Sequence, residues 1–462
     1  MTDKPNILFF FTDDQRFDTI EALGNEEIKT PHMNKLVEEG TTFTQAHIPG
    51  GTCGAVCMPS RAMLHTGKTL FHVKDHGSYI PEAHKMLGET LQEAGYQTFG
   101  TGKWHNGTEA YARSFTDGAE IMFGGMGDHW NVKACDFDPT GEYKGSKYID
   151  DPWGDNTVER RLCDHIQCGK HSSELFGEAA SEWLQNYNSK DPFFIYISFM
   201  APHDPRSMPE KFLNMYDQDQ IQLPENFQKE HFNFGVKNIR DEVLADYPRD
   251  EEEVKRHILE YYAMITHLDY EIGKVIDTLK EKGDYENTII VFAGDNGLAV
   301  GRHGLLGKQN NYEHSVRVPL IFAGPEIPEG EKRDNYVYLH DIFPTLCDLT
   351  GIEIPETVEG ISLYEAINKE TETRDYLYFA YEDKVRAIKG ERFKLIIYKT
   401  ENGVRKQLFD LKNDPGENNN IIEKDKYEDV KYDLIQKIKQ YRDRWDDNDH
   451  PTGKEFWRNS LN

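Results

Sequence analysis

One cysteine lies in a sequence context that suits a reaction centre for anions. Cys57 is followed by a methionine and then by Pro59, Ser60 and Arg61. Proline and serine suit the first turn of a helix, which places Cys57 at or just before a helix N-terminus. Backbone N–H groups favour an anion there, and Arg61 can fork onto an oxyanion. A lone cysteine is more often an inert core residue, so this prediction depends on the flanking residues.

Polar residues suited to chemistry follow four apolar runs that we predict to be strands. In open α/β sheets, ligands bind beyond the carboxyl ends of the strands, and parallel strands place these ends along one edge. We therefore expect these polar residues to lie together. Asp13 and Asp14 follow the run 6–12, Lys103 and His105 follow 97–100, His203 and Asp204 follow 193–200, and Asp295 and Asn296 follow 288–293.

Four of these side chains predict a metal site. Asp13, Asp14, Asp295 and Asn296 offer only oxygen atoms, which suit calcium or magnesium more than zinc. The alternative for Asp13 and Asp14 alone is a helix cap or a turn. The second pair of oxygen donors, Asp295 and Asn296 at an equivalent strand end, favours the metal.

The residues around Cys57 form a known family signature. The run 57–67, Cys-x-Pro-Ser-Arg-x-x-Leu-x-Thr-Gly, resembles at every defined position that of the type I, formylglycine-dependent sulfatases of the alkaline phosphatase superfamily. Residues 95–98 and 102–105 are similar to the second signature, with Thr101 where a small aliphatic residue or serine is usual. The resemblance extends from Pro5 to about Asn420.

The resemblance implies a cofactor set and a mechanism. A maturation enzyme oxidises Cys57 to formylglycine, whose hydrated form attacks sulfur and whose second hydroxyl allows the sulfate to leave. Calcium is held by the residue at position 57 together with Asp13, Asp14, Asp295 and Asn296. The implied roles of the remaining residues are charge stabilisation by Arg61, Lys103 and Lys308, protonation of the leaving alcohol by His203 alone or with Lys308, and deprotonation by His105. Arg302 and His303 are separate candidates for lining the sugar pocket.

The apolar pattern predicts an α/β fold. Short continuous apolar runs alternate with helical patterns, which indicates a mostly parallel sheet covered by helices on both faces. The resemblance makes this an alkaline-phosphatase-like core over residues 1–368, with an irregular insertion at about 106–171. Residues 369–462 are predicted to form a smaller C-terminal α+β domain, with antiparallel strands at 375–381, 386–398 and 407–410 and a helix at 427–445. Within the insertion, Trp130, Tyr143, Tyr148 and Trp153 are candidates for stacking on sugars, with local core as the alternative.

Composition excludes several classes of function. The chain has 462 residues and a formal net charge of -28, which excludes a general nucleic-acid binder. An anionic substrate then requires a cationic pocket inside a negative envelope. The six cysteines do not form a dense disulfide framework, and we find no apolar run long enough to cross a membrane. We expect a periplasmic or secreted protein whose signal peptide has been removed, with the cytoplasm as the alternative.

The expected substrate is a sulfated oligosaccharide. Residues 301–310 resemble bacterial carbohydrate sulfatases, which favours an exo-acting enzyme on glycosaminoglycan fragments, with a uronic acid 2-O-sulfate as the expected linkage. One alternative is a phosphonate or phosphate diester hydrolase of the same superfamily. A second alternative is a non-catalytic glycan-binding protein that keeps the fold. Thiol phosphatase chemistry fits less well, because its usual loop places the arginine six residues after the cysteine and Arg61 is four after Cys57.

Overall fold

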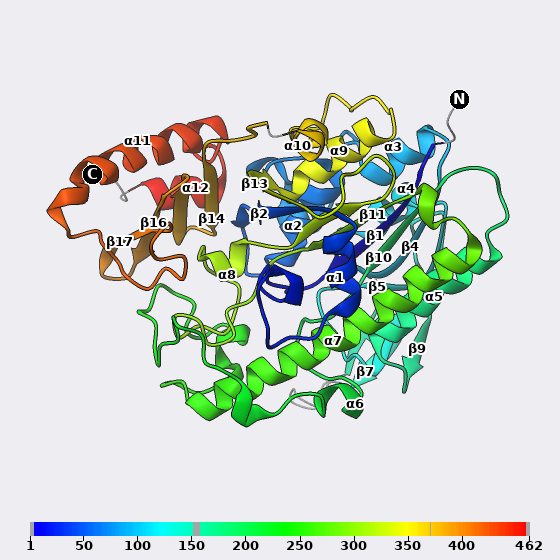
Figure 1. The fold of residues 1–462 in the computed structure, drawn as a ribbon, viewed down its shortest axis with the longest axis horizontal. Coiled ribbons are helices and arrows are strands. Elements are labelled where there is room, and N and C mark those ends of the chain that lie inside the picture. Colours follow the sequence, from blue (N-terminus) through cyan, green and yellow to red (C-terminus); the bar gives the residue numbers. More distant parts are fainter. Residues whose placement is uncertain (1–3, 151–157, 370, 459–462) are drawn as a thin grey trace.

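A mixed eight-stranded sheet forms the centre of the computed structural model, which describes residues 4–150, 158–369 and 371–458 (Figure 1). All neighbouring strands in this sheet pair in parallel except β12, which is antiparallel to both neighbours. The predicted mostly parallel sheet is therefore confirmed. Its strand order is β13 (Glu331–Tyr338), β2 (Gly40–His47), β12 (Leu320–Ala323), β11 (Thr288–Gly294), β1 (Asn6–Thr12), β10 (Phe193–Ser198), β4 (Gln97–Trp104) and β5 (Asp117–Phe123).

The alternation of side chains along β1 explains the three layers. Ile7, Phe9 and Phe11 are buried in one core, and Leu8 and Phe10 are buried in the other. The first core contains residues of α2 (Cys57–Thr66), α3 (Leu87–Glu93), α4 (Thr108–Ser114), α9 (Ile342–Leu349) and α10 (Tyr364–Asn368). The second contains residues of α1 (Pro31–Glu38), α5 (Ser172–Asn186) and α7 (Glu251–Lys282). The sheet is thus sandwiched by helices, as predicted.

The long helix α7 crosses the second face of the sheet (Figure 1). The helix begins at Glu251. The Asp250 carboxylate accepts a hydrogen bond from the Glu253 amide at 3.0 Å and so caps the first turn. Acidic side chains near a helix N-terminus are stabilised by the helix dipole. The acidic residues Glu251, Glu252 and Glu253 therefore form the first turn of α7.

A second sheet lies at the other end of the molecule, under α11 (Glu428–Arg444) and α12 (Pro451–Trp457) (Figure 1). The predicted single strand at 386–398 is wrong, because the chain turns at Gly390, whose amide donates to the Phe393 carbonyl at 2.9 Å. The order is β17 (Gly403–Asp410), β16 (Phe393–Thr400), β15 (Val385–Lys389), β14 (Leu377–Tyr381) and β3 (Gly50–Gly51). Because β3 lies shortly before Cys57, this sheet is joined to the N-terminal segment. The boundary at 368/369 stays a prediction.

The segment 106–171 contains more regular structure than the sequence predicts. It holds α4, the sheet-edge strand β5 and the strands β6 (Asn131–Ala134), β7 (Lys147–Asp150), β8 (Val158–Arg161) and β9 (His165–Cys168). The strands β6 and β9 pair with each other, as do β7 and β8. Tyr143 is buried, and its ring centre lies 4.6 Å from that of Phe123, so it belongs to the local core. Trp153 and the Tyr148 side chain lie outside the described residues.

The remaining helices are short, and α6 (Glu210–Leu213) and α8 (Glu313–Val316) have one turn each. In the described part of the chain, we find no helix whose length and apolar character would allow it to cross a bilayer. All six cysteines are unpaired in this structure.

Candidate active site

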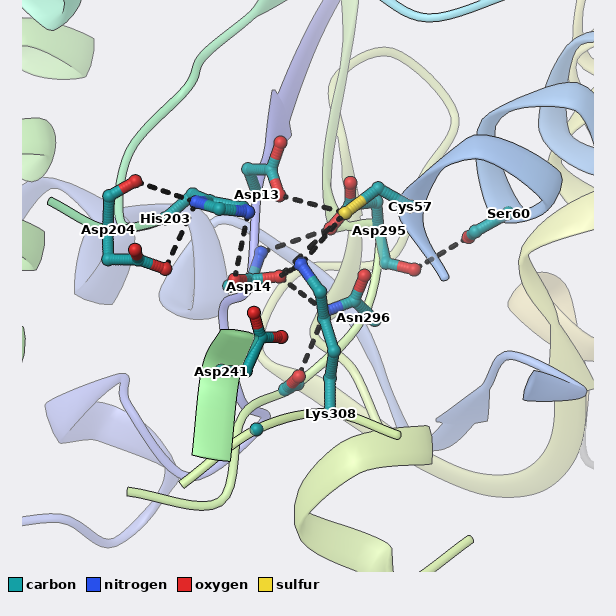
Figure 2. A network of polar contacts seen from close by, with 12 residues as sticks. Asp13, Asp14, Cys57, Ser60, His203, Asp204, Asp241, Asp295, Asn296 and Lys308 are labelled. Carbon is teal, nitrogen blue, oxygen red and sulfur yellow. Dashed lines mark hydrogen bonds and ion pairs between the residues drawn. The ribbon is translucent and has the colours of Figure 1, made fainter. Parts of the chain in front are cut away.

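The four predicted strand ends lie at one edge of the sheet. In the strand order, β11, β1, β10 and β4 are consecutive and parallel, so their carboxyl ends are neighbours. Cys57 is the first residue of α2, and Figure 2 shows it facing the ends of β1 and β11. Its Sγ atom lies 3.3 Å from Asp13 Oδ1 and 3.9 Å from Asp14 Oδ1. The Asn296 amide donates to Asp14 Oδ1 at 2.6 Å, and the Asp14 backbone amide donates to Asp295 Oδ1 at 3.0 Å.

Polar contacts from α2 hold its N-terminus against the strand ends. The Ser60 hydroxyl donates to the Asp295 carbonyl oxygen at 2.6 Å. Arg61 is 1% exposed, and its guanidinium lies 3.0 Å from Asp13 Oδ2 and 2.9 Å from Asp295 Oδ2. Arg61 also donates to the Ser198 hydroxyl on β10 at 2.5 Å. This arginine therefore bridges two carboxylates beside the cysteine.

Two lysines approach the same carboxylates from different elements. Lys103, near the end of β4, contacts Asp13 through its ammonium group. Lys308 donates to Asp14 Oδ1 at 2.6 Å and lies 3.0 Å from Cys57 Sγ. The approach of Lys103 needs the glycine that precedes it. Gly102 has a φ of 91°, and a Cβ atom there would lie 2.0 Å from a carbonyl oxygen of β10.

Two histidines complete the predicted set. The Nδ1–H of His203 donates to the Asp204 carbonyl oxygen at 2.8 Å, and its Nε2 lies 3.7 Å from Asp14 Oδ2 (Figure 2). His105 Nδ1 is buried without a hydrogen-bond partner among the described residues. The chain passes this ring at Gly125, where a Cβ atom would lie 2.8 Å from His105 Cε1. A side chain at position 125 would therefore displace the ring.

A cavity of about 350 Å³ opens next to the cysteine. Predicted residues and residues that the sequence analysis missed share its wall. Asp241 and Gln309 are among those missed. Gln309 follows the predicted Lys308 directly, whereas Asp241 lies in a stretch without periodicity. The lining residues are Gly54, Ala55, Cys57, His105, Gly125, Met126, His203, Ile239, Arg240, Asp241, Lys308 and Gln309.

Arg302 and His303 do not line this cavity. Arg302 is paired with Asp18 at 2.5 Å and lines a separate cavity of about 110 Å³. His303 is 2% exposed and stacks on Tyr312 with ring centres 4.0 Å apart. Their assignment to substrate binding stays a prediction.

Burial dominates the electrostatics of the site. It raises the pKa of Asp14, and it raises the pKa of Asp295 to about 6. Burial opposes the ionisation of Asp13 as well, but Lys103 and Arg61 outweigh it and hold the Asp13 pKa well below its usual range. For Cys57, burial and the nearby carboxylates both raise the pKa of the thiol. A cation among these groups would favour the charged carboxylates.

The donor set fits a divalent metal ion. Ligand atoms of Asp13, Asp14, Cys57 and His203 all lie within 4.8 Å of one another. In addition, Asn296 Oδ1 is buried without a hydrogen-bond partner among the described residues. Carboxylate and amide oxygens predominate, which suits a hard cation. Asp295 belongs to the same cluster, but its two oxygens already accept hydrogen bonds from Arg61 and from the Asp14 amide.

The sequence matches two protein families. Residues 5–352 match the Sulfatase family, and residues 301–444 match the family described as N-sulphoglucosamine sulphohydrolase, C-terminal. A sulfatase from Formosa agariphila is 31% identical, in an alignment that covers 90% of this chain and 82% of the relative.

More distant relatives carry more specific names. An N-acetylglucosamine-6-O-sulfatase from Bacteroides thetaiotaomicron is 26% identical over 98% of this chain and 89% of the relative. A protein solved in complex with its substrate, D-glucosamine-2-N,6-O-disulfate, superimposes with a TM-score of 0.74 at 23% identity. That superposition covers 97% of this chain and 99% of the other, and it shows that the two proteins share a fold.

Proposed function

We propose, from the premise that this chain belongs to the sulfatase family of sulfuric ester hydrolases, that it removes sulfate from a sulfated carbohydrate through a residue derived from Cys57. One observation carries the proposal. Cys57 starts a helix at the carboxyl edge of the sheet, where its sulfur lies between the Asp13 carboxylate and the Lys308 ammonium and borders a cavity. This position supports a role for residue 57 as the nucleophile that attacks a bound anion.

The proposed nucleophile is formylglycine, formed from Cys57 by a maturation enzyme. As a hydrated aldehyde, it supplies an oxygen nucleophile and a second hydroxyl group. The surroundings of Cys57 support this modification. The side chain is 3% exposed and lies beside the Asp13 carboxylate, a setting that keeps a thiol protonated and therefore weakly nucleophilic.

Calcium is the proposed metal. Asp13, Asp14 and Asn296 would hold it, together with Asp295 and the oxidised residue 57, and it would act as a Lewis acid towards the sulfuryl group. Charge supports this assignment. The charges of the three carboxylates in the cluster are balanced by Arg61, Lys103 and Lys308. A divalent cation therefore leaves the site with a net positive charge, which favours an anionic ester. Asp241 lowers this positive charge by one.

The basic residues have distinct proposed roles. Lys308, whose Nζ lies 3.0 Å from Cys57 Sγ, would stabilise negative charge on the sulfuryl oxygens. Arg61 and Lys103 contact Asp13 and would hold its carboxylate in place. His203 presents Nε2 at the cavity wall and, as an imidazolium with a proton on both ring nitrogens, would donate its Nε2 proton to the leaving alcohol there. His105, with Nδ1 unpartnered among the described residues, would accept a proton as sulfate leaves.

For the substrate, we propose an exo-acting enzyme on glycosaminoglycan-type fragments, with a uronic acid 2-O-sulfate as the preferred linkage. The named activity of the Bacteroides relative on N-acetylglucosamine 6-O-sulfate supports a sulfated sugar. A cavity of about 350 Å³ is near the lower end of the range for small-molecule sites, which supports binding of a terminal sugar.

Two measurements test the function. Mass spectrometry of the peptide that contains residue 57, from protein made in its native host, should show the aldehyde or its hydrate. A panel of defined sulfated oligosaccharides, with phosphate diesters and phosphonates as controls, should show sulfate release from one linkage. Unmodified Cys57 in all molecules would contradict the mechanism. Faster turnover of the phosphorus esters would favour the other hydrolase class, and sugar binding without turnover would favour a non-catalytic protein.

We also propose that the enzyme acts in the periplasm or outside the cell, where it would have access to large sulfated glycans. Cell fractionation of the native host, with sulfatase activity measured in each fraction, tests this. Activity confined to the cytoplasmic fraction would contradict it.

A further inference from the structure

His203 is connected to a charged residue from a distant part of the chain. The Asp204 carboxylate, which follows His203, lies 3.3 Å from His203 Nδ1. Arg240 forks onto this carboxylate: its Nη1 donates to Oδ1 at 3.1 Å and its Nη2 contacts Oδ2. The bidentate pair fixes the plane of the carboxylate. The Nδ1–H of His203 also donates to the Asp204 main-chain carbonyl at 2.8 Å, so Asp204 contacts the imidazole through its backbone and through the carboxylate that Arg240 holds.

The helical turn that carries Arg240 is itself firmly anchored. Arg240 begins the 3-10 helix η5 (Arg240–Leu244). Two residues later, the Glu242 carboxylate is 1% exposed and accepts hydrogen bonds from the amides of Leu306 and Gly307 at 3.0 and 2.8 Å. The guanidinium of Arg249 adds a bond to the same carboxylate at 2.5 Å.

Asp241, the residue between Arg240 and Glu242, ties η5 to the segment that carries Lys308. Asp241 accepts a hydrogen bond from Gln309 at 2.7 Å, next to Lys308, and Figure 2 shows Asp241 on η5 beside Lys308. Because η5 is anchored by Asp241 and Glu242, the Arg240 side chain has a fixed base. A rigid base allows one side chain to set the direction of another.

We propose that Arg240 is a positioning residue for the reaction: through Asp204 it holds the His203 ring so that Nε2 faces the leaving oxygen. The inference rests on the proposed function, in which His203 protonates the leaving alcohol. Arg240 then contributes to departure of the alcohol and leaves attack on sulfur unchanged. Leaving groups that are poor without protonation should depend on Arg240, and leaving groups that are already good should not.

A series of substituted phenyl sulfates, from 4-nitrophenyl to 4-methoxyphenyl, tests this with the full-length matured enzyme. We expect Arg240→Ala to lower kcat for 4-methoxyphenyl sulfate about tenfold more than for 4-nitrophenyl sulfate, with KM little changed, since proton transfer contributes about 10²- to 10⁴-fold in all. Asp204→Asn should give the same pattern. The double variant should be no worse than the poorer single variant, because both changes break one path.

Arg256→Ala is the matched control. Arg256 lies on α7 with a side chain 49% exposed, close to the 41% of Arg240, and it also pairs with carboxylates. It should leave every rate unchanged. An equal loss by Arg240→Ala on all leaving groups, a loss confined to KM, additive losses in the double variant, or no loss would each overturn the inference. A wild-type enzyme that releases sulfate from neither the phenyl sulfates nor the oligosaccharide panel would instead contradict the proposed function and with it the inference. If the wild type acts on the sugars alone, Arg240→Ala should lower kcat on the sugar at least about tenfold with KM little changed, because a sugar alcohol is a poor leaving group, and an unchanged kcat there would overturn the inference.

Discussion

Two buried clusters of charge in this molecule differ in how well their members are satisfied. Behind the C-terminal sheet, Asp447 accepts hydrogen bonds from Arg386 at 2.7 and 2.8 Å, from the Tyr378 hydroxyl at 2.6 Å and from the Trp457 indole at 2.7 Å. Both carboxylate oxygens have donors. The pair joins β15 to the chain between α11 and α12, so its role is to hold packed elements together.

The cluster at Cys57 is built differently. It brings carboxylates together, leaves Asn296 Oδ1 without a partner among the described residues, and borders a cavity. Buried like charges and unpartnered polar atoms are unfavourable unless a ligand compensates them. Burial of charge alone therefore does not mark a functional site. A buried cluster becomes a candidate site when some of its polar atoms lack hydrogen-bond partners and it borders a cavity.

The largest expected effect is on the nucleophile. Cys57→Ala should lower kcat/KM for a sulfated sugar by at least about 10⁴-fold, because the attacking group is lost. The melting temperature should stay close to that of the wild type. Cys347→Ala, at a buried cysteine in α9 that does not line the cavity, is the control and should keep its activity. Full activity of Cys57→Ala would show that the assigned nucleophile is wrong.

The second effect concerns the metal. Asp14→Asn removes one charge from the proposed ligand set, and calcium affinity should fall by more than the about 10- to 100-fold expected for loss of an outer partner of a ligand. Calcium titration with activity and metal analysis measures this, and chelation of the wild type should likewise reduce activity. Asp136→Asn, at a side chain 82% exposed, should change neither. Unchanged calcium content in Asp14→Asn would argue against the site.

The third effect is confined to stability. Arg386→Met leaves the Asp447 carboxylate buried with a missing partner, and the free energy of unfolding should fall by about 3–5 kcal/mol. Activity per folded molecule should not change. The control is Lys431→Met, which removes an exposed pair with Glu428 and should cost about 0–1 kcal/mol. If Arg386→Met cost no more than this control, Tyr378 and Trp457 alone would satisfy Asp447.

The smallest effect is a pH dependence at the same aspartate. Burial opposes the ionisation of Asp447, but Arg386 outweighs it and leaves the pKa lowered. A lowered pKa in the folded state gives stability that is present above the unfolded value of about 3.9 and is lost as the pH falls through the folded value. As the pH falls between the unfolded and the folded pKa, the difference in unfolding free energy between the wild type and Asp447→Asn should shrink by up to about 1.4 kcal/mol per pH unit. Chemical denaturation of both proteins from about pH 2.5 to about pH 6 measures it, and parallel curves would contradict it.

The sequence predicts the central strands well because they are short, continuous apolar runs buried on both faces. The predicted strand 6–12 coincides with β1, and 288–293 falls one residue short of β11. The gathering of Asp13, Lys103, His203 and Asp295 follows from the same cause, because parallel neighbours end at one edge. The interior of 106–171 was missed because its strands β5, β6 and β9 mix exposed with half-buried or buried residues and contain no long continuous apolar run.

The sequence by itself determined the chemistry of the site: a helix that starts at Cys57, the oxygen donors at two strand ends, and the basic residues that accompany them. Only the tertiary structure decided which further residues join them. Arg240 lies 36 residues from Asp204, and no local pattern links the two. Arg302 pairs with Asp18 and does not line the cavity beside Cys57, and its predicted role in sugar binding stays a prediction. Local propensity acts over a few residues, whereas such contacts depend on how the whole sheet and its connections pack.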